Sequence, residues 1–246
     1  MKFTEDSLFV APTPLRLAEE LAGWFYSIAL EHTLHNRTFH LAMSGGSTPV
    51  LFFNHLAAKY GHHIDWSKIH IFWADERCVP PTSNISNFKN VQNNLLSKIN
   101  IPEENIHRIH GENDPEEEAI RYGKVIAEFV PMKDDIPHFD LILLGIGDDG
   151  HTASLFSGQE KLFFSGNMAE TSINPQNDQR RITLTPYLIN NAARVAFHVT
   201  GLSKADIICD VLNHPDQKMH PASHIKPVHG DMYWFLDAGA SKGLFV

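Results

Sequence analysis

The sequence predicts an α/β fold with a doubly wound, mostly parallel sheet and helices on both faces. Short apolar segments alternate with longer amphipathic segments along the chain of 246 residues, as they do in parallel-sheet proteins. The run FDLILL at residues 139–144 is apolar on both faces and too short for a helix, which is typical of a central strand. Polar or glycine-rich loops follow several apolar runs, and open α/β sheets bind their ligands at such strand ends.

Helices are expected where apolar residues recur with helical spacing. The first expected helix starts with Thr13 and Pro14, residue types that favour the N-cap and the first helical position. Pro49 opens the second expected helix in the same way. In chain order, the expected helices are residues 13–30, 49–60, 84–99, 115–129 and 203–212.

Strands are expected where short apolar runs end in turn residues or charges. The first run ends in a glycine loop, and the second carries the aromatic residues Phe72 and Trp73 before a charged cluster. No regular pattern is visible in residues 165–179. In chain order, the expected strands are residues 38–43, 69–74, 139–144, 180–184, 194–200 and 233–236.

Composition indicates one domain over residues 1–246, because no repeat, low-complexity tract or linker interrupts the pattern. The net charge of -9 and the lack of a basic run argue against nucleic acid or an anionic membrane as a partner. The first ten residues carry acids and no long apolar core, and no run reaches the roughly 18 apolar residues of a spanning helix. We therefore expect a cytoplasmic protein, either a monomer or a homodimer.

Cysteine and histidine usage predicts no metal site and no cofactor. The two cysteines are far apart in the sequence, so neither a disulfide framework nor a thiolate zinc site is indicated. Three histidine pairs have metal-like spacing but lack an accompanying acid, and we interpret them as surface or capping residues. These pairs are His32/His35, His107/His110 and His220/His224.

Two polar loops follow the first two expected strands. The loop SGGSTP offers backbone N–H groups and hydroxyls just before a helix N-terminus, which suits a phosphate group. It matches neither a Walker A loop nor GxGxxG, so no nucleotide is implied. In WADERCVP, Asp75 is the first residue after the strand, whereas Glu76 and Arg77 fit a solvated ion pair. The glycine-loop candidates for substrate binding are Ser44, Gly45, Gly46, Ser47 and Thr48.

Two further loops follow the later strands. In LLGIGDDGHTASLF, glycines allow a sharp turn that brings Asp148, Asp149 and His151 to a cleft at the strand end. In VTGLSKA, Lys204 lies in the first turn of a helix, where a cation opposes the helix dipole unless an anion is near. Arg181, at the start of a later strand, is a second basic residue for the same anion.

Taken together, these motifs resemble the 6-phosphogluconolactonase family. The segments that carry the resemblance occur in the family's order over roughly residues 38–238: SGGSTP, WADERCVP, GIGDDGHTASLF, RITLT, VTGLSKA and PASHIKPVHGDMYWFLD. The resemblance implies a Rossmann-like sheet of the glucosamine-6-phosphate deaminase type that binds no nucleotide. It also implies hydrolysis of 6-phospho-D-glucono-1,5-lactone, a small sugar-phosphate lactone of the pentose phosphate pathway. Ser157 departs from the family, which commonly has proline there.

The candidate residues suit this reaction. A histidine titrates near about pH 6.5, so His151 can take a proton from water and return it to the leaving ring oxygen. Asp149 can fix the His151 tautomer, and Asp75 either shares that task or orients sugar hydroxyls. The oxyanion would be stabilised by glycine-loop N–H groups or by Arg77. The groups expected to hold the phosphate are Gly45, Gly46, Ser47, Arg181 and Lys204, and no metal is needed.

Two other functions stay open. A glucosamine-6-phosphate deaminase or isomerase would use the same loops, but that related family normally carries a glutamate five residues after the histidine. This chain has Phe156 at that position. A non-catalytic sugar-phosphate-binding protein that reads DNA would need a helix-turn-helix, and the residues before 38 hold mostly one amphipathic helix.

Overall fold

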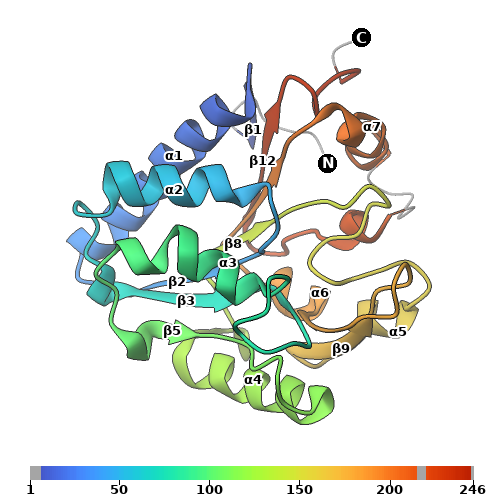
Figure 1. The fold of residues 1–246 in the computed structure, drawn as a ribbon, viewed down its shortest axis with the longest axis horizontal. Coiled ribbons are helices and arrows are strands. Elements are labelled where there is room, and N and C mark those ends of the chain that lie inside the picture. Colours follow the sequence, from blue (N-terminus) through green and yellow to red (C-terminus); the bar gives the residue numbers. More distant parts are fainter. Residues whose placement is uncertain (1–6, 215–219, 245–246) are drawn as a thin grey trace.

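A seven-stranded sheet forms the centre of the molecule (Figure 1). Its strands are β1 (Leu8–Ala11), β2 (Phe39–Met43), β3 (Ile69–Trp73), β5 (Ile106–His107), β8 (Leu141–Leu144), β11 (Arg194–Val199) and β12 (Asp231–Asp237). They run in the order β1-β12-β11-β8-β2-β3-β5, and every neighbouring pair is parallel. The computed structural model describes residues 7–214 and 220–244, so most of the N-terminal segment considered above lies outside the described residues. The predicted parallel α/β fold is confirmed.

Helices cover both faces of this sheet, with α1 and α2 side by side above it and α4 below it in Figure 1. The helices are α1 (Pro14–Leu34), α2 (Pro49–Tyr60), α3 (Asn87–Asn94), α4 (Pro115–Phe129), α5 (Glu160–Phe163), α6 (Pro186–Ile189) and α7 (Ala205–Asn213). As predicted, the Thr13 side chain caps α1 by accepting a hydrogen bond from the Arg16 backbone N–H. The helix expected over residues 84–99 is shorter, because Ser86 caps it and residues 96–98 form a 3-10 turn.

The strand predicted at residues 180–184 forms, but it belongs to a second sheet. β10 (Arg180–Leu184) pairs antiparallel with β4 (Asp75–Arg77) and with β9 (Ala169–Ile173). Residues 75–77 were expected to be a loop and 165–179 to be irregular, so both expectations were wrong. Polar side chains that are buried through hydrogen bonds hide the strand pattern of β9, as with the Ser172 hydroxyl, which donates to the Ser154 carbonyl. A short hairpin, β6 (Met132–Lys133) and β7 (Ile136–Pro137), completes the strands of the described residues.

One residue joins the two sheets. The Ala74 N–H donates to the Met43 carbonyl in β2, and the Ala74 carbonyl accepts a hydrogen bond from the Leu184 N–H in β10. The chain therefore passes from the first sheet to the second within one residue after β3. The ends of both sheets meet at this junction, next to Asp75.

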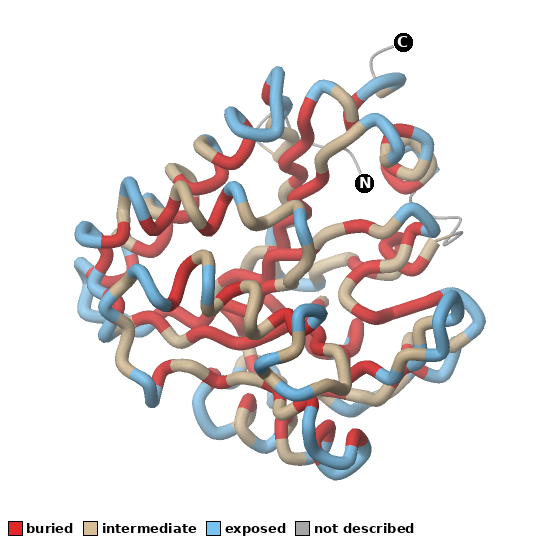
Figure 2. The backbone as a smooth tube through the Cα atoms, in the orientation of Figure 1, coloured by how far each residue is buried: buried red, intermediate tan, exposed pale blue. Residues whose placement is uncertain are grey.

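The core lies on both faces of the seven-stranded sheet, and Figure 2 shows the central strands buried and the outer helix surfaces exposed. All residues of β2 and β8 are buried. The Tyr122 hydroxyl of α4 donates to the Trp73 carbonyl and accepts from the Trp73 N–H, which fixes α4 to the end of β3. None of the helices within 7–214 and 220–244 has the length and apolar character needed to cross a bilayer.

Several histidines lie inside the fold, contrary to their interpretation as surface or capping residues. His32 and His107 are buried, and the His107 Nε2 atom lies 2.9 Å from the His70 Nδ1 atom. His40 contacts the Asp140 carboxylate with both its backbone N–H and its ring. The described part of the chain holds no group of three His, Cys, Asp or Glu side chains arranged to bind a metal ion.

Acid is expected to destabilise the fold through His107. Burial lowers the pKa of His107 to about 4, whereas an unfolded chain binds this proton below about pH 6.5. The contribution of neutral His107 to the free energy of unfolding is complete above pH 6.5 and is lost as the pH falls towards 4. About 2 kcal/mol of it is lost by pH 5. Urea unfolding at about pH 7.5 and about pH 5 should show this decrease in the free energy of unfolding. In His107→Phe the decrease between the two pH values should be smaller by the contribution of His107.

The control for this prediction is His62→Phe, which changes an exposed histidine and should leave the pH dependence of unfolding as it is in the wild type. An unchanged pH dependence in His107→Phe would contradict the assignment of acid sensitivity to this side chain.

Candidate active site

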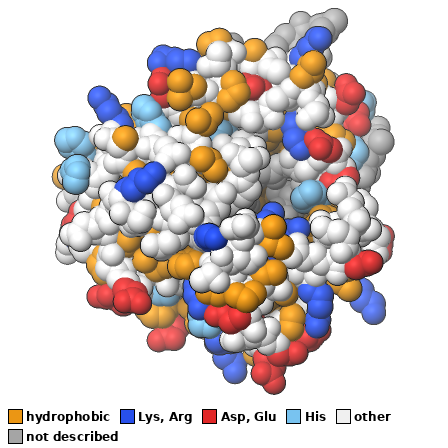
Figure 3. All heavy atoms as spheres, viewed as in Figure 1, with side chains coloured by type: hydrophobic (Ala, Val, Ile, Leu, Met, Phe, Trp, Pro, Cys, Tyr) orange, Lys and Arg blue, Asp and Glu red, His pale blue; other side chains and the backbone are white. Residues whose placement is uncertain are grey.

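A pocket of about 420 Å³ opens where four segments follow the central strands. Three of these segments are loops, residues 44–48 after β2, 145–156 after β8 and 200–204 after β11, and the fourth is strand β4 (Asp75–Arg77), which follows β3. Figure 3 shows the surface hollowed to the right of centre, with Lys or Arg and His side chains around the hollow. All but one of the site residues predicted from the sequence line the pocket, namely Ser44, Gly45, Gly46, Ser47, Thr48, Asp75, Arg77, His151, Arg181 and Lys204. The exception is Asp149, which is not among the lining residues.

Asp149 holds the His151 ring from one side. The Asp149 Oδ1 atom lies 2.5 Å from His151 Nδ1 and also accepts the His151 backbone N–H at 3.1 Å. The hydrogen bond from the ring lowers the pKa of Asp149 to about 2, so this carboxylate is ionised at neutral pH and can only accept. The Nδ1 atom of His151 is therefore the donor, and Nε2 is the nitrogen left for proton transfer.

Glycine is required beside this histidine. A Cβ atom at Gly147 would lie 2.1 Å from the His151 ring, and Gly150 has a φ of +78°, a backbone conformation that L side chains rarely adopt. The Gly147 N–H donates to the His151 carbonyl at 2.8 Å and closes the turn. The sequence GDDGH thus folds into a tight turn that presents the imidazole at the end of β8.

Phe156 packs against the catalytic candidate instead of offering a carboxylate. Its ring is buried, and its centroid lies 4.7 Å from that of the His151 ring. This is the position where a glutamate is expected under the deaminase alternative. Phe156 therefore helps to orient the His151 ring through van der Waals packing and not through a hydrogen bond.

The glycine loop lies between β2 and α2. The Ser44 N–H donates to the Leu143 carbonyl of β8, and Gly46 has a φ of +95°. The Asn90 side-chain amide of α3 donates to the Gly46 carbonyl at 3.0 Å. The Thr48 side chain lines the pocket and makes no capping hydrogen bond to α2.

Gly45→Ala is expected to destabilise the protein, because a Cβ atom there would lie 2.2 Å from the Asn87 Oδ1 atom. Overpacking of this kind typically costs about 1–3 kcal/mol in the free energy of unfolding. Urea denaturation measures this cost. The matched control is Gly166→Ala, where the added methyl group meets open space, and an equal effect at both sites would contradict a specific clash.

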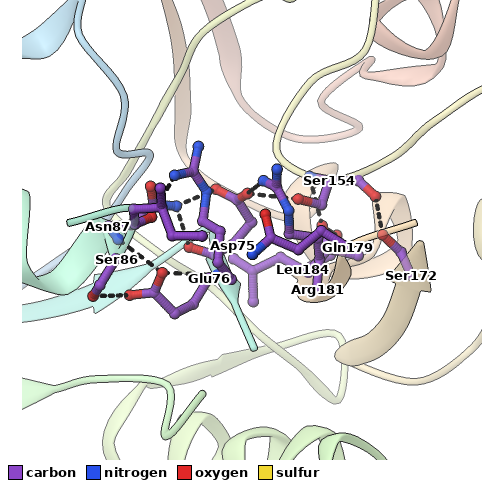
Figure 4. Close-up of polar contacts among 12 residues, drawn as sticks. Asp75, Glu76, Ser86, Asn87, Ser154, Ser172, Gln179, Arg181 and Leu184 are labelled. Carbon is purple, nitrogen blue, oxygen red and sulfur yellow. Dashed lines mark hydrogen bonds and ion pairs between the residues drawn. The ribbon is translucent and has the colours of Figure 1, made fainter. Parts of the chain in front are cut away.

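Asp75 is buried and fully engaged by neighbouring side chains (Figure 4). Its Oδ1 atom accepts from the Asn87 amide at 3.1 Å, and its Oδ2 atom accepts from the Ser154 hydroxyl at 2.6 Å. Arg181 lies 3.7 Å from the same Oδ2 atom. The carboxylate that contacts His151 is thus Asp149, whereas Asp75 ties together α3, the histidine loop and β10.

Glu76 is buried, contrary to its interpretation as part of a solvated ion pair. Its carboxylate accepts the backbone N–H groups of Asn87 and Phe88 at the start of α3, and the Ser86 hydroxyl (Figure 4). Burial raises the pKa of Glu76, and these backbone hydrogen bonds oppose that rise. Glu76 therefore fixes the end of α3 that carries Asn87.

Sequence reasoning missed Asn87 and Ser154 as site residues. Asn87 follows Ser86 at a helix start, where Ser and Asn ordinarily indicate capping alone. Ser154 lies within the histidine motif and is buried, which its polar residue type does not indicate. Their only signal in the sequence is their nearness to motif residues.

The three basic residues that line the pocket differ in their burial and in the groups that they contact. Arg181 is buried, which lowers the pKa of its guanidinium, and its Nε atom has no hydrogen-bond partner. The Arg77 Nη1 atom donates to the Ile85 carbonyl, and its Nε atom is also unpartnered. The Lys204 Nζ atom lies 2.6 Å from the Asp148 carboxylate, a contact that lowers the pKa of Asp148. Lys204 lies at a helix start, where a cation is unfavourable unless an anion is near, and the Asp148 carboxylate is such an anion.

Comparisons with known proteins identify the family to which the chain belongs. The family model described as glucosamine-6-phosphate isomerases/6-phosphogluconolactonase matches residues 12–234. A 6-phosphogluconolactonase of Haemophilus influenzae is 42% identical over 209 residues, which cover 84% of this chain and 88% of that protein. The solved 6-phosphogluconolactonase from Trypanosoma cruzi has a TM-score of 0.89 at 26% identity, covering 100% of this chain and 99% of that one.

A solved monomeric glucosamine-6-phosphate deaminase has a TM-score of 0.82 at 19% identity and covers 95% of this chain and 98% of its own. At this identity the likeness concerns the fold alone, and it confirms the deaminase-type sheet expected from the sequence. With a family match that spans most of the described residues, the chain belongs to the glucosamine-6-phosphate isomerase/6-phosphogluconolactonase family.

Proposed function

We propose that the protein hydrolyses 6-phospho-D-glucono-1,5-lactone to 6-phospho-D-gluconate, a step of the oxidative pentose phosphate pathway, with His151 activating the attacking water. The observation that carries the proposal is that His151, whose Nδ1 atom is paired with Asp149, lines a pocket together with Arg77, Arg181 and Lys204. Such a pocket combines a proton-transfer group with cationic groups for a phosphate ester. The activity of the named relatives supports the choice of substrate.

In the proposed mechanism, His151 Nε2 takes a proton from a water molecule, and the oxygen of that water attacks the lactone carbonyl carbon. The ionised Asp149 carboxylate stabilises the imidazolium that forms and keeps Nδ1 protonated. Collapse of the tetrahedral intermediate breaks the bond between the carbonyl carbon and the ring oxygen. The imidazolium then returns its proton to that oxygen, which restores neutral histidine.

The developing oxyanion needs hydrogen-bond donors placed before the reaction starts. Backbone N–H groups of the glycine loop and the Arg77 guanidinium border the pocket and have the required chemistry. Arg181 and Lys204 provide the charge for the phosphate, and Lys204 would exchange its contact with Asp148 for one with the ligand. Holding the remote phosphate converts binding energy into orientation of the carbonyl.

Asp75 has a positioning role in this proposal. Both of its carboxylate oxygens are occupied by Asn87 and Ser154, and its charge stands beside the buried Arg181. Asp75 contacts the side of the Arg181 guanidinium that faces the protein, and the other side is left for the ligand.

The test is acid release from freshly prepared 6-phosphogluconolactone, corrected for the spontaneous hydrolysis of this lactone. We expect a catalysed rate that follows enzyme concentration. Ammonia release from glucosamine 6-phosphate is measured in parallel, and release of ammonia without lactone hydrolysis would favour the deaminase alternative. Binding of both compounds with turnover of neither would favour a sugar-phosphate-binding protein.

A further inference from the structure

Buried polar atoms without a partner gather around the pocket. Eight residues in the described part of the chain carry such atoms. Five of these residues line the pocket, and they are Ser44, Arg77, Asn87, Arg181 and His198. Unpaired buried polar atoms are rare, because each costs free energy unless water or a ligand satisfies it. The other four residues have already been described in the site, whereas His198 has no part in the proposed mechanism.

His198 lies on the central strand β11 with its side chain 95% removed from solvent. Neither Nδ1 nor Nε2 has a hydrogen-bond partner, and the Phe52 ring of α2 approaches edge-on with its centroid 6.4 Å away. Burial lowers the pKa of His198 to about 4. The ring is therefore neutral at neutral pH and carries one donor and one acceptor, both unused.

The strand register brings His198 next to an open space. Phe197 of β11 pairs with Leu144 of β8, so His198 is level with Gly145, the next residue along. Residues in register on neighbouring strands present their side chains to the same face. A Cβ atom added at Gly145 would meet no other atom within 4 Å. The absent side chain of Gly145 thus leaves room beside the imidazole, at the start of the loop that carries His151.

The wall around this space is apolar and uncharged. Buried side chains of α1, α2, β2 and β8 form it together with His198, namely Leu21, Phe52, Phe53, Met43 and Leu143. A phosphate group would lose its hydration here without gaining a cationic partner, which is unfavourable. A hydroxyl group both donates and accepts, so it matches a neutral imidazole.

We propose that His198 is a further substrate-binding residue, whose imidazole hydrogen-bonds a sugar hydroxyl at the inner wall of the pocket while the basic residues hold the phosphate. The inference rests on the proposed function in taking the ligand to be a sugar phosphate. It gives the pocket two chemically different ends, a cationic end for the phosphate and a neutral end that recognises the sugar.

The test compares the wild type with His198→Phe in calorimetric titrations with 6-phosphogluconate and with inorganic phosphate. We expect the variant to bind 6-phosphogluconate about tenfold or more weakly, because one hydroxyl is left without its partner. Binding of inorganic phosphate should be unchanged, because phosphate contacts the cationic end. Weakening of both ligands to the same extent, or of neither, would overturn the proposal; the latter result would leave a buried water as the partner of His198.

Thermal unfolding separates this role from a structural one. His198→Phe removes two unpaired buried polar atoms and keeps an aromatic ring, so we expect its Tm to stay equal or to rise. His198→Gln, which retains a donor and an acceptor, should recover part of the affinity for 6-phosphogluconate. If phenylalanine prevents folding, His198→Leu serves as the apolar variant. A wild type that fails to hydrolyse the lactone but shows this binding difference would refute the proposed function and leave the inference standing.

Discussion

His151→Ala is expected to lower kcat for lactone hydrolysis by about 10²–10⁴-fold, the usual contribution of general acid–base catalysis. KM should change little, because the proposed contacts to the phosphate come from other residues. The loss has two physical parts, since the same imidazole takes the proton from water and returns it to the ring oxygen. Initial rates over a range of substrate concentrations, corrected for spontaneous hydrolysis, separate kcat from KM.

Two further variants test whether the loss of kcat is specific to His151 and its partner Asp149. His63→Ala removes an exposed histidine and should behave as the wild type. Asp149→Asn leaves an amide that still accepts one hydrogen bond from His151, so its kcat should fall between those of the wild type and His151→Ala. If His151→Ala kept more than half of the wild-type kcat at neutral pH, the water would have to be activated by another group.

Lys204→Ala is expected to reduce kcat/KM for the phosphorylated lactone by about one to two orders of magnitude. Charge-assisted contacts to a phosphate are worth roughly 1.5–3 kcal/mol, and this loss should appear mainly as a higher KM. Slow hydrolysis of unphosphorylated gluconolactone should be almost unchanged. The partner of Lys204, Asp148, is largely exposed, so the variant leaves no buried charge and its Tm should stay close to that of the wild type.

Arg181→Ala should show the same preference between substrates but with a lower Tm, because it leaves the buried Asp75 without its ion pair. Arg180→Ala is the matched control on the same strand, since Arg180 is exposed and pairs with Glu116 outside the pocket. An equal loss of activity on both lactones would mean that Lys204 and Arg181 support the chemistry or the fold. Arg77 would then be the next candidate for binding the phosphate.

The sequence predicts those elements whose side chains follow one simple pattern. β2, β3, β8 and β11 are apolar runs, and the proline-initiated helices α1, α2 and α4 appear close to their expected places. β1 and β5 were missed because they are short edge strands, with four and two residues. The second sheet was missed because β9 is stabilised by buried hydrogen bonds between polar groups, which no periodicity of hydrophobic residues reveals.

The site could be predicted where a motif residue both touches the pocket and follows a strand. The four motif segments meet as expected, although one of them is strand β4, because the carboxyl ends of parallel strands lie at one edge of the sheet. The two hydrogen-bond partners of Asp75 could not be predicted, because Asn87 lies at a helix start and Ser154 in a loop that is distant in the sequence. His198 carried a signal that was overlooked, since it is the polar residue in the buried run VAFHV.

The junction at Ala74 has a consequence for the lifetime of the folded protein. The pocket is lined by the glycine loop, which follows a strand of the first sheet, and by Arg181 of the second sheet, so a sugar phosphate bound as proposed would contact both parts of the fold. Ligand at a hundred times its Kd stabilises the folded state by about 2.7 kcal/mol through mass action. We therefore expect the protein to resist heat and proteases better when a sugar phosphate is bound than when the pocket is empty.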